Sequence, residues 1–191
     1  MQYGRYKNVR NASWQCLIDF NVQELPVKVM TIANQAGISV HKYSNVSEDR
    51  LSTGESGVTF IKNNKIHIVY RDAETDERCR FTIAHELGHI FLGHSLTGND
   101  IYRTFDVSKP EIEQEADVFA SRLLAPACVL WGLNLHTAEE IARFCKISLS
   151  AAQVRADRME ILYKRNMFLS HPLERKVFNN FRDFIEKQNP K

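Results

Sequence analysis

The stretch Arg80 to His94, RFTIAHELGHIFLGH, holds two histidines and a glutamate whose types and spacing suit metal-dependent hydrolysis. His85, Glu86 and His89 form the pattern H-E-x-x-H. Residues four apart lie one above the other on an α-helix, so both imidazoles could grip one ion, and Zn²⁺ accepts neutral imidazole nitrogen. Glu86 follows His85 by about 100° around the helix, so it would flank the metal and take a proton from water there. The stretch therefore predicts a catalytic zinc site.

A helix must carry this motif, and the sequence predicts one from about residue 78 to 92. Its apolar stripe would lie on the side away from the histidine pair, which suits a helix buried on one face. The stripe consists of Ile83, Leu87, Ile90 and Phe91. The alternative is a pair of core or surface histidines that happen to lie one turn apart.

His94 is a weaker candidate for a metal ligand. One large group of zinc proteases takes a third histidine six positions after the second, but Ser95 stands there in this chain. If the helix continued, His94 would point about 140–180° away from His85 and His89.

The third ligand is expected on a second helix, within Ser108 to Pro126, which Ser108 and Glu111 would open as a capping box. Glu113 and Asp117 lie at the edge of its apolar arc, whereas Glu115 falls on the far, solvated side. An acid drawn toward a core needs a partner, and a zinc ion would supply one. We therefore expect Glu113 as the third ligand, chosen over Glu115. The alternative is an ordinary amphipathic helix with solvated acids.

Asp117 is predicted to support the site from outside. It is placed one turn after Glu113, where it could accept a hydrogen bond from a ligand histidine and fix its tautomer.

Together, RFTIA-HELGH and E-x-E-A-D-x-F-A-x-x-L-L-x-P resemble the ImmA/IrrE family of zinc metallopeptidases, relatives of thermolysin-like enzymes. The resemblance spans roughly residues 25–126 and continues more weakly to about 160. It implies His85, His89 and Glu113 as zinc ligands, Glu86 as general base and Asp117 as their outer support. Two positions depart from the pattern: Arg71 stands where such sequences often have Asn, and Ala125 stands where Met is common.

A small β-sheet is predicted beside the metal-bearing helix. A helical pattern starts at Leu25 and stops at Gly37, a strand follows at 38–40, and Gly57 to Tyr70 forms a hairpin that turns at Asn63-Asn64. An exposed edge of such a sheet could hold an extended peptide by main-chain hydrogen bonds. His67, within the hairpin, is expected to be a surface or packing residue.

The composition favours one sizeable α+β domain with an appended helical module. The chain has 191 residues, 43% of them hydrophobic and 25% charged. No long apolar run and no signal-like N-terminus is present, so we expect a cytoplasmic protein. The four cysteines never form C-x-x-C and should be free thiols. A net charge of +2 does not by itself indicate a nucleic-acid partner.

The predicted division places a zinc metallopeptidase core at 1–130 and a helical region at 131–191. Within the latter, 137–160 resembles a helix-turn-helix whose polar side chains could face DNA, although such helical hairpins are also ordinary packing units. Those side chains are Ser150, Gln153, Arg155 and Arg158. An amphipathic tail helix follows, expected to pack on the body rather than on a partner or a second copy of the chain.

The sequence thus predicts a small sheet and hairpin packed on a zinc-bearing helix, acting as a metalloendopeptidase. The family resemblance implies a protein substrate, a transcriptional repressor of a mobile element or stress regulon. Two alternatives stay open: a non-catalytic regulator that binds a repressor or DNA, and a structural zinc protein. Candidates for stabilising the oxyanion, by type and location only, are Tyr70, Arg71, Tyr102 and Arg103.

Overall fold

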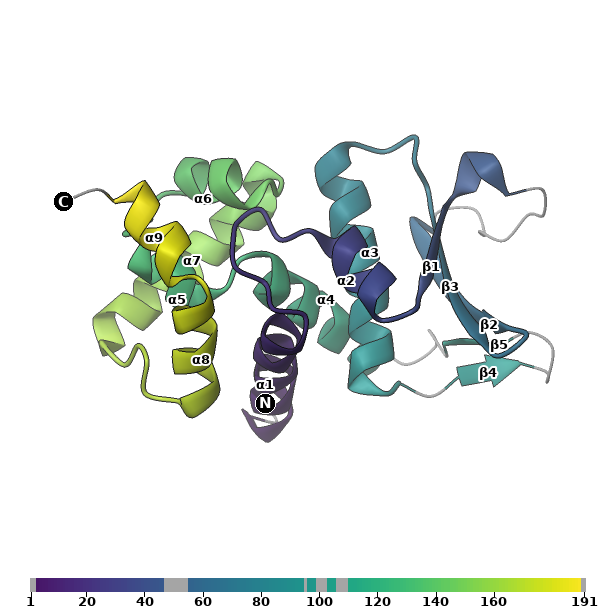
Figure 1. Cartoon of the computed structure of the whole chain (residues 1–191), viewed down its shortest axis with the longest axis horizontal. Helices are drawn as coiled ribbons and strands as arrows, with labels where there is room; N and C mark the ends of the chain where they lie inside the picture. Colours follow the sequence, from purple (N-terminus) through teal and green to yellow (C-terminus); the bar gives the residue numbers. More distant parts are fainter. Residues whose placement is uncertain (1–2, 47–54, 95, 99–102, 106–109, 190–191) are drawn as a thin grey trace. The chain divides into compact units, whose positions relative to one another are not determined.

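The computed structural model describes residues 3–46, 55–94, 96–98, 103–105 and 110–189, and it confirms the predicted α+β class (Figure 1). The chain forms two compact units. Residues 28–120 make up one, called here the sheet unit, and residues 1–27 with 121–191 make up the other, called the helical unit. None of the helices in the described ranges is long and apolar enough to cross a membrane.

The sheet unit contains a mixed sheet with the strand order β1-β3-β2-β5-β4. Strand β1 runs parallel to β3, and the other neighbours are antiparallel. The strands are β1 (Ser39–Lys42), β2 (Gly57–Lys62), β3 (Lys65–Tyr70), β4 (Leu96–Gly98) and β5 (Arg103–Phe105). The predicted hairpin is confirmed as β2 and β3, which pair antiparallel. Asn63 and Asn64 at its turn take the positive φ angles of 52° and 59° that a tight turn requires.

Helix α3 (Asp76–Leu92) carries H-E-x-x-H and contacts β2 and β3. It begins slightly before the predicted start, because the Thr75 hydroxyl accepts a hydrogen bond from the backbone N–H of Arg78 and caps the first turn. It ends where Gly93 adopts a left-handed φ of 68°. The short helices α2 (Val29–Gln35) and η1 (Tyr43–Asn45) complete this part of the unit.

Helix α4 (Pro110–Leu124) confirms the second predicted helix, although Ser108 of the predicted capping box lies outside the described residues. Residues 110–120 of α4 belong to the sheet unit and residues 121–124 to the helical unit. The remaining helices of the helical unit are α1 (Tyr3–Asp19), α5 (Ala127–Gly132), α6 (Ala138–Cys145), α7 (Leu149–Arg165), α8 (Pro172–Asn180) and α9 (Arg182–Gln188). The four cysteines are free, as predicted.

The two ends of the chain belong to the same unit. Helix α8 contacts both α1 and α5, and the predicted tail stripe is buried at Val177, Phe181 and Ile185. The apolar stripe of the tail extends over two helices, α8 and α9, rather than over the single helix that was predicted. The division at residue 130 remains a prediction, but these units group the chain differently, since α1 packs with the C-terminal helices.

The helical hairpin at 137–160 is confirmed as α6 and α7. A capping box between Thr137 and Glu140 opens α6, and Lys146 takes a left-handed φ of 51° at its end. The suggestion that Arg155 faces a DNA groove is wrong. Its side chain lies on the buried face with Ala152 and Met159, and its Nε donates to the Ala125 carbonyl at 2.8 Å. That burial lowers the pKa of Arg155 to about 10.

Candidate metal centre

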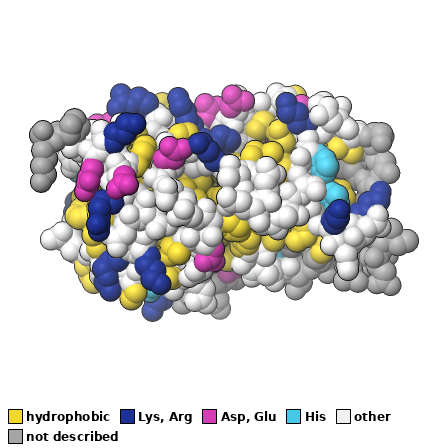
Figure 2. Space-filling view, viewed as in Figure 1, with side chains coloured by type: hydrophobic (Ala, Val, Ile, Leu, Met, Phe, Trp, Pro, Cys, Tyr) yellow, Lys and Arg dark blue, Asp and Glu magenta, His cyan; other side chains and the backbone are white. Residues whose placement is uncertain are grey.

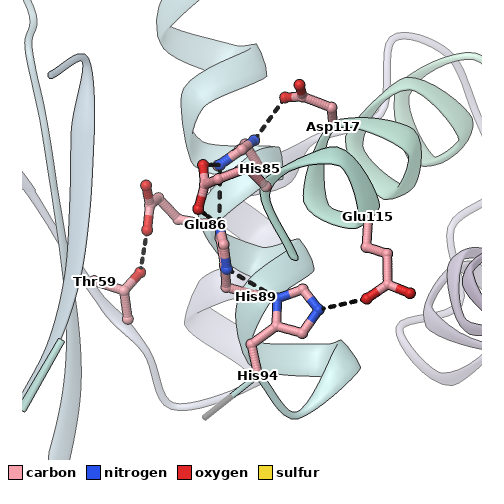
Figure 3. A network of polar contacts seen from close by, with 8 residues as sticks. Thr59, His85, Glu86, His89, His94, Glu115 and Asp117 are labelled. Carbon is pink, nitrogen blue, oxygen red and sulfur yellow. Dashed lines mark hydrogen bonds and ion pairs between the residues drawn. The ribbon is translucent and has the colours of Figure 1, made fainter. Parts of the chain in front are cut away.

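Two helices of the sheet unit bring His85, His89 and Glu113 together. The Nε2 atoms of His85 and His89, one turn apart on α3, lie 3.0 Å apart (Figure 3). From α4, the Glu113 carboxylate places Oε2 3.3 Å from His85 Nε2 and Oε1 3.2 Å from His89 Nε2. One donor atom from each residue lies within 4.8 Å of the others. These three side chains, which the sequence analysis selected, could hold a metal ion.

The polar atoms at this cluster fit a cation. Oε1 of Glu113 is buried and accepts no hydrogen bond within the described part of the chain. Its near neighbour, His89 Nε2, lies 3.2 Å away but makes no hydrogen bond to it. A buried carboxylate oxygen without a donor is costly, and a cation between it and the two imidazoles would remove that cost. Two imidazole nitrogens and one glutamate also form a donor set that catalytic Zn²⁺ accepts while keeping a position for water.

The electrostatics of the cluster differ between the two histidines. Burial lowers the pKa of His85, but hydrogen bonds to Asp117 and Glu113 outweigh it and raise the pKa to about 9. Burial, with the positive charge of His85, lowers the pKa of His89 to about 4. The hydrogen bond from His85 lowers the pKa of Glu113. Without metal, the carboxylates beside His85 therefore favour its charged form, whereas burial disfavours the charged form of His89.

Asp117 lies where the sequence analysis placed it. One turn after Glu113 on α4, its Oδ1 is 2.8 Å from His85 Nδ1 (Figure 3). When Nδ1–H of His85 donates to this carboxylate, Nε2 keeps its lone pair and faces Glu113 and His89.

Glu86 is buried against the sheet, with 7% of its surface exposed. The Thr59 hydroxyl on β2 donates to Oε2 of Glu86 at 2.6 Å (Figure 3). Burial raises the pKa of Glu86, and the hydrogen bond from Thr59 offsets part of that rise. Thr59 was not predicted from the sequence, although the alternation of side chains along the hairpin could have placed it on the face that meets α3.

Two glycines let the elements of the site approach each other. A Cβ at Gly57 would lie 3.3 Å from Glu86 Oε1 and would also clash with the Thr82 side chain, so β2 meets α3 through bare backbone. A Cβ at Gly88 would lie 3.1 Å from the Cα of Ala116 and 3.2 Å from its carbonyl oxygen, so α3 meets α4 in the same way.

His94 and Glu115 lie beside the cluster, although neither is one of the three residues that could hold the ion. His94 Nδ1 lies 2.9 Å from His89 Nδ1, and His94 Nε2 lies 3.1 Å from Glu115 Oε2 (Figure 3). The prediction that Glu115 is solvated is wrong, since its side chain is 15% exposed. His94 would point away only on a continuing helix, but the left-handed Gly93 ends α3 and turns the next residue back.

Other candidates lie elsewhere. His67 stacks on Phe60 and contacts His41 at 3.1 Å between ring nitrogens, which agrees with a packing residue. Arg71, at the end of the hairpin, donates from Nε to the Glu55 carbonyl at 3.1 Å. Tyr102 and the side chain of Arg103 lie outside the described residues, so the oxyanion donor stays unassigned.

Comparison with known proteins gives one family. The model of the IrrE N-terminal-like domain, Peptidase_M78, matches residues 33–157, which is more than half of the chain and includes every residue of the cluster. No curated protein matches the chain.

Proposed function

The chain belongs to the IrrE N-terminal-like domain family of peptidases, and from this premise we propose that it is a zinc-dependent endopeptidase acting on a protein substrate. The observation that carries the proposal is the convergence of His85, His89 and Glu113, with Glu86 one residue from the first ligand. These groups match the H-E-x-x-H mechanism, in which the glutamate serves as base.

Each group of the chain has a role in the proposed reaction. Zn²⁺ held by His85, His89 and Glu113 would supply Lewis acidity toward the scissile carbonyl and the attacking water. Glu86 accepts the proton of that water and passes it to the leaving amine. Burial raises the pKa of Glu86, which makes its carboxylate a stronger base toward the proton of that water. Thr59 occupies Oε2 and leaves Oε1 to exchange the proton, while Asp117 keeps His85 Nε2 directed at the metal.

We further propose that the substrate is bound as an extended strand along β2. Among the described residues, β5 pairs with Phe60 and Ile61 of β2, whereas Gly57 to Thr59 pair with β3 alone. This part of β2 also carries Thr59, which contacts Glu86. Main-chain hydrogen bonds to a strand edge hold a peptide with little dependence on its sequence.

The substrate class rests on the family. Resemblance to the ImmA/IrrE peptidases favours a DNA-binding transcriptional repressor of a mobile element or stress regulon, a protein that would be met in the cytoplasm. The first substrate to test is a DNA-binding repressor from the same genome whose gene is a neighbour of the gene for this chain.

The test compares wild type with Glu86→Gln after zinc analysis of both proteins. We expect both to retain zinc, and wild type to cut the repressor at one bond roughly 10²–10⁴-fold faster than the variant. Mass spectrometry of the fragments identifies the bond. A chelator should stop the wild-type reaction and added Zn²⁺ should restore it.

The same experiment separates the alternatives. A Glu86→Gln variant that still relieves repression in a reporter assay would favour a regulator that acts by binding. Zinc with four protein ligands would indicate a structural site.

Direct contact with DNA is the less favoured alternative. On the face shown in Figure 2, the Lys and Arg side chains of the described residues are interspersed with Asp and Glu rather than gathered in one patch. Arg155, one of the side chains proposed for contact, is buried. A mobility-shift assay with operator DNA should therefore show no salt-sensitive binding by the peptidase alone.

A further inference from the structure

We propose that His94 and Glu115 form a positioning pair that holds His89 in the tautomer able to bind the metal. This inference rests on the proposed zinc site and assigns a role to the two residues that were considered as ligands and set aside. Neither would touch the ion, because each acts through the ring of His89.

A metal at Nε2 of His89 would determine the direction of each hydrogen bond in this chain of contacts. A metal bound at Nε2 of His89 requires that nitrogen to be unprotonated, so the ring proton sits on Nδ1. Nδ1 of His89 lies 2.9 Å from Nδ1 of His94, which must then be the acceptor. The proton of His94 therefore sits on Nε2, which donates to Glu115 Oε2 at 3.1 Å. The carboxylate thus selects the tautomer of His94, and His94 selects that of His89.

The three side chains are sheltered from water. Their exposed fractions are 2% for His89, 6% for His94 and 15% for Glu115. Water competes poorly for hydrogen bonds at such positions, so the pair sets the state of the His89 ring more firmly than solvent would.

The two metal-facing histidines are supported in different ways. His85 contacts a carboxylate directly, and that carboxylate, Asp117, is 59% exposed. His89 is linked to the carboxylate of Glu115 through the imidazole of His94, and the side chains of His94 and Glu115 are both largely buried. Both arrangements leave Nε2 directed at Glu113, which lies 3.3 Å from His85 and 3.2 Å from His89.

Two variants of His94 distinguish the effect of its hydrogen-bond acceptor from the effect of the space that its ring fills. His94→Phe keeps an aromatic ring and removes the acceptor, whereas His94→Asn places an amide oxygen near the position of Nδ1. Glu115→Leu and Glu115→Gln make the same comparison for the carboxylate, because the amide oxygen of Gln can still accept from Nε2. His41→Phe is the matched control, since it removes a histidine of the sheet unit that contacts His67 rather than the cluster.

Zinc affinity of the whole chain, measured by competition with a chelating dye, is the first readout. We expect His94→Phe and Glu115→Leu to weaken binding by roughly 10- to 100-fold, as loss of such outer hydrogen bonds does elsewhere. His94→Asn, Glu115→Gln and His41→Phe should keep most of the affinity. Melting of the metal-free proteins, followed by circular dichroism, checks that each is folded.

The second readout is the protonation of His89 in the zinc-loaded protein, observed by NMR of ¹⁵N-labelled histidine. Wild type should show a proton on Nδ1 that exchanges slowly with water, and His94→Phe should show faster exchange. Equal zinc affinity in His94→Phe and wild type would overturn the inference while leaving the zinc site intact. Equal loss in His94→Phe and His94→Asn would reduce His94 to packing. A wild type that takes up no zinc at His85, His89 and Glu113 would overturn this inference and the proposed function together.

Discussion

Four carboxylates around the two metal-facing histidines are distinguished by the side chain each one contacts. Glu113 faces both Nε2 atoms, Asp117 contacts Nδ1 of His85, Glu115 contacts His94, and Glu86 accepts from Thr59. The same functional group can therefore serve as ligand, as support or as base, because its partner decides where its lone pairs are directed.

Replacing Thr59 with Val should slow catalysis without removing the metal. The side chain is buried, and valine keeps its shape but not the hydroxyl that donates to Glu86. An unsatisfied buried acceptor costs about 1–3 kcal/mol, so we expect kcat/KM to fall by roughly 5- to 150-fold. Burial already raises the pKa of Glu86, and loss of this donor should raise it further, which moves the acidic limb of the pH profile upward.

Thr59→Ser is the matched control, because it keeps the hydroxyl and should keep most of the activity. A Thr59→Val enzyme with the pH profile and rate of wild type would show that the hydroxyl does not act on Glu86.

Metal-free Glu86→Gln should be more stable than metal-free wild type at neutral pH. Burial raises the pKa of Glu86 in the folded state, so the unfolded chain gives up this proton first as pH rises. The carboxyl therefore favours folding most below its unfolded pKa of about 4.3, and this contribution is lost above it. The stability advantage of Glu86→Gln should grow between pH 4 and pH 7 in denaturant titrations with chelator present.

Glu140→Gln provides a control of opposite sign. Backbone hydrogen bonds from Thr137 and His136 lower the pKa of Glu140, so its carboxylate stabilises the fold above the unfolded pKa. That variant should lose stability relative to wild type as pH rises. A Glu86→Gln difference that does not change with pH would contradict the burial argument.

At the level of elements, the site depends on how closely α3 approaches its neighbours. Helix α3 supplies both histidines and α4 supplies Glu113, and the two helices meet where Gly88 faces the backbone of Ala116. Close contact at this point lets the short glutamate side chain reach both Nε2 atoms.

Gly88→Val should separate the helices and weaken metal binding. A Cβ at Gly88 would already lie 3.1 Å from the Cα of Ala116, and backbone in a packed helix cannot move aside cheaply. We expect a loss of about 1–3 kcal/mol in the free energy of unfolding together with lower zinc affinity. Gly37→Ala is the control: its φ of 71° makes alanine costly by about 1–2 kcal/mol, but open space surrounds it, so zinc affinity should stay unchanged. Equal zinc affinity in Gly88→Val and wild type would contradict the proposed spacing role.

Local signals in the sequence predicted several elements correctly. Asn63-Asn64 marked the hairpin turn, and Thr137 with Glu140 marked the start of α6. These signals succeed because a turn or a cap is decided by residues within a few positions of each other.

The contacts of His94, Glu115 and Thr59 were not predicted from the sequence. His94 turns toward His89 because the left-handed Gly93 ends α3, so a direction extrapolated along a continuing helix does not apply to its side chain. Thr59 meets Glu86 across 27 positions of sequence, through the way the sheet packs on α3. Arg155 was misjudged for the same reason, since its acceptor is the carbonyl of Ala125, 30 positions earlier.

At the level of the whole molecule, the residues around the cluster all belong to the sheet unit, whereas both chain ends belong to the helical unit. The N-terminal helix α1 is stabilised by packing on α8. Trp14 illustrates this packing, since it is 6% exposed and its ring lies 5.3 Å from that of His171.

Trp14→Ala should therefore affect stability rather than chemistry. Removing this side chain should cost roughly 3–5 kcal/mol in the free energy of unfolding, measured by urea denaturation. Zinc affinity, measured where the variant is still folded, should match wild type. Gln15→Ala, at an exposed position of α1, is the control and should change stability by less than about 0.5 kcal/mol. A Trp14→Ala protein that keeps full stability would show that α1 is dispensable to the helical unit.

The lack of a side chain at Gly57 limits which substitutions at this position are compatible with the site. A methyl group there would crowd both Thr82 and the Glu86 carboxylate, even though the nearby turn at Asn63-Asn64 is exposed. In a saturation library selected for repressor cleavage, the turn should accept many amino acids, whereas codon 57 should return glycine alone.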